Sequence, residues 1–385
     1  MVYIFGAGKN GIKLLKYLKS INNLLQMGVE ISAFIDNDIS KQGVEIEGIE
    51  CICLNEAIRR GAQNHIVLIS PYKCDEIKKQ LEIRGFHKVI NVGEILNSRI
   101  KNFVPEYFAK TNYKYLVPFA DYESPYPDIV EIEKREDELF DREKDVLGID
   151  LNLGSQLELV NKMKSLESPV WYSKNIGGGV RYYYDNPWYL RVDANVLSYL
   201  IAIIKPKRIV EVGSGFSTAA MLDVNEKNFN NKIQIVSIEP NAERLKSLLK
   251  ETDNITIYEK NLQTVPLSFF ETLKENDLLF IDSSHISKFN SDVNYLFFEI
   301  LPRLHHGVYI HFHDIQYPFI YPKEWIYEGR AYTEMYLLRA FLINNKEYSV
   351  YFWCDMLQEK AKSCLIDPLL GSATSSIYIR KTDVT

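Results

Sequence analysis

Short apolar segments alternate with amphipathic helical segments in two separate blocks of this chain, and no other feature of the sequence restricts the fold as strongly. Strands and helices that alternate in this way form a parallel sheet with helices on its faces. We therefore predict an α/β protein with two doubly wound sheets. The expected strands of the first block cover residues 2–5, 31–35, 66–69 and 88–92. Those of the second block cover residues 208–212, 233–238, 255–258, 278–281, 308–312, 348–353 and 376–380.

The second block ends in a pair of strands that follows five strand–helix units. This layout is typical of a doubly wound sheet with an antiparallel strand at its end. Between the blocks lie Tyr- and Pro-rich loops, a charged run and a predicted helix at residues 156–166. We divide the chain into an N-terminal domain at residues 1–97, a connector at 98–192 that packs on the following domain, and a C-terminal domain at 193–385.

Composition limits the classes of function. The chain of 385 residues has 45 Lys and Arg against 51 Asp and Glu, a net charge of −6. Proteins that bind nucleic-acid phosphates normally carry a positive balance, so we expect no nucleic-acid partner. The longest apolar stretches have about nine residues, whereas a membrane-spanning helix needs roughly 20. With no secretory leader pattern before the first strand, we predict a cytoplasmic protein without a membrane span.

A glycine-rich turn follows the first predicted strand. Gly6, Gly8 and Gly11 form a G-x-G-x-x-G pattern ahead of a helix, and Asp36 ends the next strand. Such glycines let a phosphate approach the helix N-terminus, and the acid can accept hydrogen bonds from a ribose. The same glycines also suit a tight turn that binds nothing, so both interpretations stay open. With residues 33–43, the block resembles the small nucleotide-sugar-binding Rossmann domains of sugar-modifying enzymes.

A second glycine turn follows the strand at residues 208–212. Gly213 and Gly215 stand on either side of Ser214, and Glu239 ends the next strand. Compared with a dinucleotide-binding loop, this loop is poor in glycine and suits a ligand that has a ribose but no pyrophosphate. Glu239 can accept hydrogen bonds from both ribose hydroxyls. S-adenosylmethionine fits this description.

These residues, with Glu211 two positions before Gly213, are similar to motif I and the ribose-binding acid of class I S-adenosylmethionine-dependent methyltransferases. The resemblance covers residues 193–385 and implies a seven-stranded Rossmann-like sheet, with Ser217 at a position where the family often has glycine. Residues 124–128 and 181–188 further resemble an uncharacterised bacterial subgroup associated with surface-glycan synthesis. The resemblance implies cofactor contacts from Glu211, Gly213, Ser214, Gly215, Ser217, Glu239, Asn261, Asp282 and Ser283.

Acidic and histidine side chains follow the fourth and fifth strands of this domain. The class I strand order makes these strands neighbours, so we expect Asp282 and Asp314 to converge at the sheet edge. One hypothesis is that the two carboxylates hold a divalent cation such as Mg²⁺. The other hypothesis is metal-free, with His285 or His313 as the general base that removes a hydroxyl proton.

The expected activity is O-methyl transfer from S-adenosylmethionine to a hydroxyl of a sugar or nucleotide-linked sugar in glycan biosynthesis. An aromatic segment at residues 316–334 suits stacking on sugar faces, although it could equally be a packed lid. The alternatives are a non-catalytic scaffold that binds nucleotide-sugars, or an NAD-dependent sugar oxidoreductase. Expected partners are a small-molecule or glycan acceptor and a nucleotide-sugar at the N-terminal domain. The sequence is compatible with a homodimer but does not fix the oligomeric state.

Overall fold

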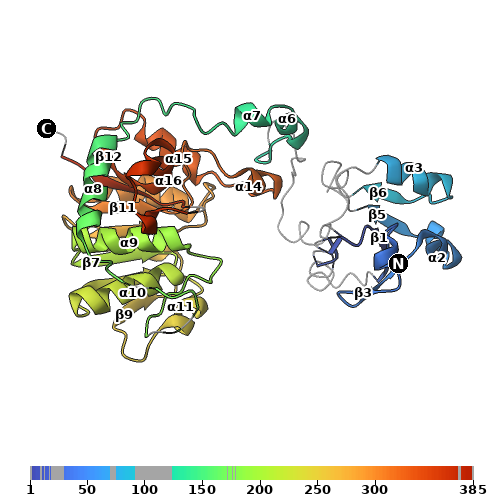
Figure 1. The fold of residues 1–385 in the computed structure, drawn as a ribbon, viewed down its shortest axis with the longest axis horizontal. Helices are drawn as coiled ribbons and strands as arrows, with labels where there is room; N and C mark the ends of the chain where they lie inside the picture. Colours follow the sequence, from blue (N-terminus) through green and yellow to red (C-terminus); the bar gives the residue numbers. More distant parts are fainter. Residues whose placement is uncertain are drawn as a thin grey trace. The chain divides into compact units, whose positions relative to one another are not determined.

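The computed structural model describes residues 2–8, 11–12, 14–16, 18, 30–69, 75–91, 124–170, 172–175, 177, 179–371 and 374–383. It divides into two compact units, Met1–Lys134 and Arg135–Thr385 (Figure 1). The part of the predicted connector from residue 135 onward therefore belongs to the C-terminal unit. None of the helices among these residues has the length and apolar character needed to cross a bilayer.

The N-terminal unit contains a six-stranded sheet in the order β3-β4-β2-β1-β5-β6, parallel except for the β3–β4 hairpin. Alternate residues of its strands face two cores: Tyr3 and Phe5 contact one, and Ile4 contacts the other. The strands are β1 (Val2–Phe5), β2 (Ile31–Ile35), β3 (Glu45–Ile46), β4 (Ile49–Ile52), β5 (Ile66–Ile69) and β6 (Val89–Asn91). The helices are α2 (Leu54–Arg59), α3 (Asp75–Ile83) and α6 (Ile129–Lys134), with 3₁₀ turns at Ile39–Lys41 and Ala62–Asn64.

The C-terminal unit contains a seven-stranded sheet in the order β12-β13-β11-β10-β7-β8-β9. β13, next to the edge strand β12, runs opposite to the other six strands, which confirms the predicted class I methyltransferase fold with an antiparallel strand at the end of the sheet. The strands are β7 (Arg208–Val212), β8 (Gln234–Ile238), β9 (Ile255–Tyr258), β10 (Leu278–Ile281), β11 (Tyr309–Phe312), β12 (Tyr348–Trp353) and β13 (Ile377–Lys381).

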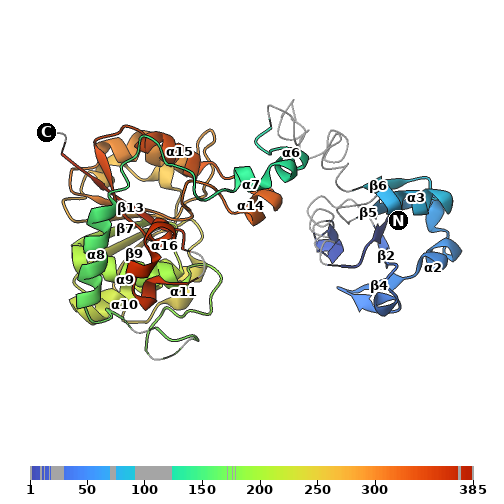
Figure 2. The ribbon, with the colours of Figure 1, turned by 45° about the horizontal axis from the view of Figure 1, so that its top comes forward.

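Helices cover both faces of this sheet (Figures 1 and 2). Along β7, Val210 and Val212 contribute to one core, while Ile209 contributes to the other. Both faces are buried, which explains why these strands are apolar almost throughout. The helices are α7 (Glu136–Leu139), α8 (Leu153–Ser165), α9 (Arg191–Ile204), α10 (Phe216–Phe229), α11 (Glu243–Leu248), α12 (Leu267–Phe270), α13 (Asp292–Tyr295), α14 (Lys323–Tyr327), α15 (Glu334–Leu342) and α16 (Cys354–Lys360). A π-helical segment, Leu296–Ile300, continues α13. Short 3₁₀ turns lie at Leu262–Thr264, Leu301–Arg303, Lys362–Cys364 and Asp367–Leu369.

Helix α8, which lies in the predicted connector, packs against the seven-stranded sheet. Its residues Leu159, Val160 and Met163 are buried in the same core as Phe352 of β12. The fully buried amide of Gln156 accepts a hydrogen bond from Trp353 N at 2.7 Å and donates one to Leu151 O at 2.6 Å. These contacts fix α8 against the sheet.

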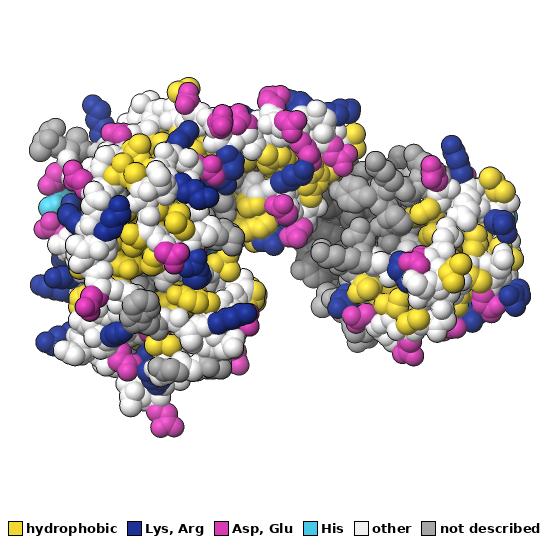
Figure 3. Space-filling model, in the orientation of Figure 1, with side chains coloured by type: hydrophobic (Ala, Val, Ile, Leu, Met, Phe, Trp, Pro, Cys, Tyr) yellow, Lys and Arg dark blue, Asp and Glu magenta, His cyan; other side chains and the backbone are white. Residues whose placement is uncertain are grey.

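An insertion between β11 and β12 contains α14 and α15. Helix α15 buries Met335, Leu338 and Leu342 in the main core, because these side chains recur on one helical face. Helix α14 is tied to α7 at the edge of the unit through Glu136, which contacts Lys323 and Tyr327. On the face visible in Figure 3, Lys and Arg side chains are interspersed with Asp and Glu side chains.

Candidate active site

Four neighbouring parallel strands of the seven-stranded sheet end at the same level. Val212 of β7 pairs in register with Ile238 of β8 and Ile281 of β10, which in turn pairs with Phe312 of β11. The carboxyl edge of an open α/β sheet is where such folds bind ligands. The first residues beyond the four strands are Gly213, Glu239, Asp282 and His313.

The glycine turn after β7 leaves no space for a side chain at its first glycine. Gly213 has a φ of 81°, and a Cβ atom there would lie 1.9 Å from the carbonyl oxygen of Asp282. Gly215 caps α10, and its N–H donates to Thr218 Oγ1 at 3.1 Å. The hydroxyl of Ser214 is buried and has no hydrogen-bond partner among the described residues. The turn thus combines a close backbone approach with one unpaired polar group.

Glu211 supports this turn from inside the fold. Its carboxyl oxygens accept hydrogen bonds from Ser217 Oγ at 2.6 Å and Thr218 Oγ1 at 2.5 Å, and its side chain is fully buried. Burial raises the pKa of Glu211 to about 8, against the opposing effect of the two hydroxyl donors. Glu211 and Ser217 therefore shape the turn. Thr218 completes this set; it is the third residue of the helix after the capping Gly215, a position from which side chains commonly bond back to the start of a helix.

Glu239 lies half-buried at the end of β8. One carboxylate oxygen accepts from Ser214 N at 3.3 Å, and the other accepts from Asn241 N at 2.8 Å. Each oxygen has two lone pairs, so both retain acceptor capacity for ribose hydroxyls. Asn261 follows β9 and caps the turn Leu262–Thr264, with its side chain exposed.

The structure brings Asp282, His285 and Asp314 together at the ends of β10 and β11. His285 Nε2 lies 3.5 Å from Asp282 Oδ1 and 3.4 Å from Asp314 Oδ2. One ligand atom from each of the three residues lies within 4.8 Å of those of the other two. This convergence agrees with the predicted meeting of the two carboxylates and adds an imidazole between them.

The charged groups of this cluster shift one another's pKa values. Burial by itself lowers the pKa of His285, but hydrogen bonds to Asp282 and Glu334 outweigh it and raise that pKa well above 6.5. Burial opposes the ionised form of Asp282, but His313 and His285 lower its pKa to about 2. The site therefore holds negative charge on Asp282 and favours a proton on His285.

Glu334, the first residue of α15, belongs to the predicted aromatic segment at residues 316–334, but the sequence predicts no individual role for it. Its carboxylate accepts from Ser283 Oγ at 2.8 Å and lies 2.8 Å from His285 Nδ1, with only 1% of the side chain exposed. The residue lies 49 positions from His285 in the chain, and only the fold of the insertion brings the two together. An acid that begins a helix is ordinarily interpreted as a helix-dipole partner, so no local pattern indicates this contact.

The two candidate bases differ in their surroundings. His313 is packed in the fold, with its Nδ1 3.3 Å from Ser376 Oγ and its ring 5.2 Å from that of Tyr189. Burial lowers the pKa of His313, and Asp314, Asp282 and Asp193 raise it overall. His285 has its Nε2 directly between the two site carboxylates, whereas His313 Nε2 is 3.7 Å from Asp314 alone. Of the two, His285 is the histidine that the acidic cluster surrounds.

Aromatic side chains of the insertion lie beside His285. The ring of Tyr332 is 5.0 Å from the imidazole of His285, and Trp325 packs edge-to-face on Tyr332 at 5.6 Å. The guanidinium of Arg330 lies 4.6 Å from the centre of the Trp325 ring. Tyr332 and Trp325 are partly exposed and Arg330 is exposed, so this group is available to a ligand.

The segment at residues 181–188 has mainly a packing role. Arg181 is buried and forms ion pairs with Asp223, Asp253 and Glu226. Trp188 is the exception, because it is 56% exposed and lies 3.8 Å from the guanidinium of Arg244.

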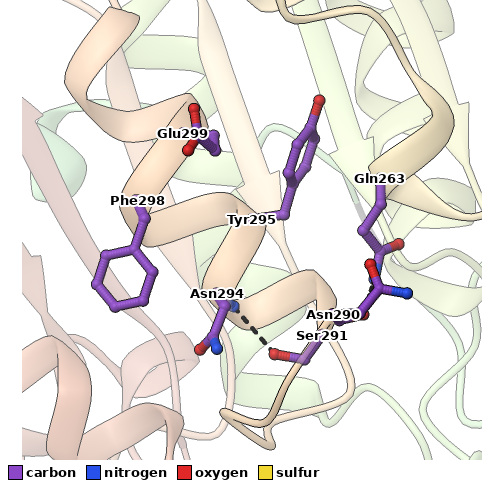
Figure 4. A pocket seen from close by; sticks show the side chains of 7 residues that line it. All are labelled: Gln263, Asn290, Ser291, Asn294, Tyr295, Phe298 and Glu299. Carbon is purple, nitrogen blue, oxygen red and sulfur yellow. Dashed lines mark hydrogen bonds between the residues drawn. The ribbon is translucent and has the colours of Figure 1, made fainter.

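An open cavity of about 310 Å³ lies elsewhere on the C-terminal unit (Figure 4). None of the predicted site residues lines it. Its walls come from the turn Leu262–Thr264, from α13 and from the segments on both sides of α13. The lining residues are Gln263, Asn290, Ser291, Asn294, Tyr295, Phe298 and Glu299.

In the N-terminal unit, Asp36 is hydrogen-bonded to the glycine turn itself. Its Oδ2 accepts from Ala7 N at 2.7 Å and from Lys41 Nζ at 3.4 Å, and its Oδ1 accepts from Asp38 N at 2.9 Å. Gly6 has a φ of 99°, which only glycine adopts readily. These contacts explain how the turn is held without a ligand, and Oδ1 still has acceptor capacity.

Comparison with known proteins identifies the central part of the C-terminal unit. Residues 210–315 match the family described as "Methyltransferase domain". An uncharacterized protein of Archaeoglobus fulgidus is 38% identical over 168 residues, which are 42% of this chain and 75% of the relative. The S-adenosylhomocysteine-bound structure of the Podospora anserina methyltransferase PaMTH1 is 15% identical, covers 68% of this chain and 99% of its own, and gives a TM-score of 0.34. UDP-D-quinovosamine 4-dehydrogenase from Vibrio fischeri is 23% identical, covers 28% of this chain and 84% of its own, and gives a TM-score of 0.18.

Proposed function

We propose that the chain, which belongs to one family with the archaeal relative, is an S-adenosylmethionine-dependent methyltransferase that methylates a hydroxyl of a sugar or nucleotide-linked sugar. The observation that favours a hydroxyl group as the methyl acceptor is the position of His285 between Asp282 and Asp314. A hydroxyl needs a base as it attacks a methyl group, and an imidazole flanked by carboxylates suits that role.

The turn after β7 and the end of β8 fit the cofactor. Gly213 and Gly215 bring backbone close to a ligand, Ser214 offers an unpaired hydroxyl, and Glu239 keeps lone pairs for the ribose. We assign Asn261 to the adenine and Ser283 to the methyl-transfer side of the cofactor. When bound, S-adenosylmethionine supplies an electrophilic methyl group on a sulfonium centre.

His285 acts as the base in this proposal, in its neutral form. Because its carboxylate neighbours raise its pKa, the rate should increase with pH as His285 loses its proton. As the acceptor oxygen forms its bond to the methyl carbon, the carbon–sulfur bond breaks and the hydroxyl proton moves to Nε2 of His285. Asp282 and Asp314 stabilise the imidazolium that results, because both carboxylates lie within 3.5 Å of Nε2. Alignment of the acceptor with the methyl group supplies a large part of the acceleration.

A second assignment of the same cluster is a divalent cation held by Asp282 and Asp314, with His285 as third ligand. The donor set of two carboxylates and one imidazole within 4.8 Å favours it. Mg²⁺ prefers oxygen ligands, so the two carboxylates suit that ion better than the imidazole does. A bound cation would act as a Lewis acid toward the acceptor oxygen. His285 cannot ligate a metal through Nε2 and accept a proton there at once.

The aromatic group at the insertion supports a sugar acceptor. Tyr332 and Trp325 offer partly exposed ring faces beside the base, and Arg330 offers donors for hydroxyl or phosphate oxygens. A nucleotide-sugar would bind at the N-terminal turn of Gly6, Gly8 and Gly11. There, Asp36 could accept from its ribose.

A methyl-transfer assay tests this function. The full chain is incubated with S-adenosylmethionine and a panel of sugars and nucleotide-sugars, and mass spectrometry follows gain of one methyl group together with S-adenosylhomocysteine. We expect a methyl ether on one class of sugar, at a rate that chelator treatment changes less than about twofold if His285 is the base. Loss of most activity with chelator, restored by Mg²⁺, would assign the carboxylates to a cation. Transfer only to nitrogen or sulfur acceptors would contradict the proposal.

A further inference from the structure

The insertion between β11 and β12 is fastened to the loop that carries His285. The N–H groups of Thr333 and Glu334 both donate to the carbonyl oxygen of His285, at 2.9 and 3.1 Å. Thr333 Oγ1 accepts from Ser287 N at 2.7 Å, and Ser283 Oγ donates to Glu334. His285 has a φ of 61°, in the left-handed region that residues with a Cβ atom seldom adopt. The hydrogen bonds to α15 therefore hold the loop in a conformation that costs energy locally.

Within this arrangement, Glu334 fixes the direction of the imidazole ring. A buried carboxylate is costly unless hydrogen bonds satisfy it, and Glu334 finds partners in Ser283 and in Nδ1 of His285. With Nδ1 held by Glu334, the opposite nitrogen faces Asp282 and Asp314. The hydrogen bond at Nδ1 therefore sets which way the two ring nitrogens point.

We infer that Glu334 is a positioning residue, which holds Nδ1 of His285 and so keeps Nε2 directed toward Asp282 and Asp314, where the acceptor hydroxyl is deprotonated in our proposal. The inference rests on the proposed role of His285 as base. The insertion then has two functions, because Tyr332, which lies beside the base, is only two residues before Glu334, which orients the base. The acceptor side of the site and the base are then assembled by one element.

The test combines kinetics with nuclear magnetic resonance of the full chain. Glu334→Gln keeps the size of the side chain but replaces the charged acceptor of the Nδ1 proton. We expect kcat to fall about 10- to 100-fold, with the KM for S-adenosylmethionine and the affinity for S-adenosylhomocysteine unchanged. In a His285→Gln background the same change should cost nothing further, because Glu334 acts through His285.

The spectroscopic readout needs no substrate. A proton held between an imidazole and a buried carboxylate gives a slowly exchanging downfield resonance. We expect such a signal in the unaltered protein, its absence in His285→Gln and its loss or large upfield shift in Glu334→Gln. Glu328→Gln is the matched control, since Glu328 is exposed in the same insertion and its carboxylate pairs with Arg330. That variant should leave the signal in place.

The outcomes separate this inference from the proposed function. If no sugar is methylated but the downfield proton depends on Glu334, the sugar O-methyltransferase proposal fails while the contact that orients His285 stands. An unchanged downfield signal in Glu334→Gln overturns the inference. So does a double variant whose loss of kcat equals the combined losses of His285→Gln and Glu334→Gln, because Glu334 would then act independently of His285. Should Glu334→Gln fail to fold, Glu334→Asp replaces it, and a signal identical to that of the unaltered protein would then contradict the inference.

Discussion

Replacing Gly213 with alanine is expected to destabilise the C-terminal unit and abolish cofactor binding. The new Cβ would lie 1.9 Å from Asp282 O, so the ends of β7 and β10 would have to separate. Overpacking and the left-handed φ of 81° together cost about 3 kcal/mol. That is a large fraction of the roughly 5–15 kcal/mol that stabilises an ordinary domain. Thermal unfolding followed by circular dichroism measures this effect.

Gly179→Ala separates the two causes of this loss. Gly179 has a φ of 75°, and apart from its chain neighbours no described residue has an atom within 4 Å of the position of its Cβ. This control should therefore show only the conformational cost of about 1 kcal/mol and keep cofactor binding. If Gly213→Ala were no less stable than Gly179→Ala, the close approach of the strand ends would be wrong.

Replacing His285 with glutamine is expected to reduce kcat about 100- to 10,000-fold, because the variant lacks a group that can take the hydroxyl proton. The affinity for S-adenosylhomocysteine should change little, since our proposal places the cofactor on Gly213, Gly215 and Glu239. Steady-state kinetics on the sugar found in the assay measures the first quantity, and calorimetric titration measures the second.

The matched control for this prediction is His306→Gln. His306 is exposed in the turn before β11 and has Asp383 as a partner at 3.5 Å. We expect its kcat to stay within about twofold of the unaltered protein, as for most surface changes. A His285→Gln enzyme that keeps full turnover would exclude His285 as the base.

The fold could be predicted from the sequence for those strands that are continuous runs of apolar residues. The seven strands of the C-terminal sheet were predicted to within about one residue at each end, because their buried faces make them continuous runs of apolar residues. The hairpin of β3 and β4 was missed, since its strands are short and partly polar. Its turn is Glu47-Gly48 rather than the Asn-Gly or Asp-Gly that usually marks such hairpins.

The candidate site could be predicted only where residues directly follow strands. Asp282 and Asp314 meet as expected because the strand order makes β10 and β11 neighbours. The contact between His285 and Glu334 could not be foreseen, since it depends on how an irregular insertion returns to the sheet. Binding of Glu239 to a ribose, the N-terminal ligand, a homodimer and a cytoplasmic location stay predictions.

Calorimetric titration of the purified chain with S-adenosylhomocysteine tests the central claim most directly. We expect micromolar affinity in the unaltered protein and no measurable binding in Glu239→Ala, because that variant lacks the acceptor for the ribose hydroxyls. Glu259→Ala, which removes only a surface ion pair with Lys246, should bind like the unaltered protein. Absence of binding in the unaltered chain, or equal affinity in Glu239→Ala, would contradict the cofactor site described at the ends of β7 and β8.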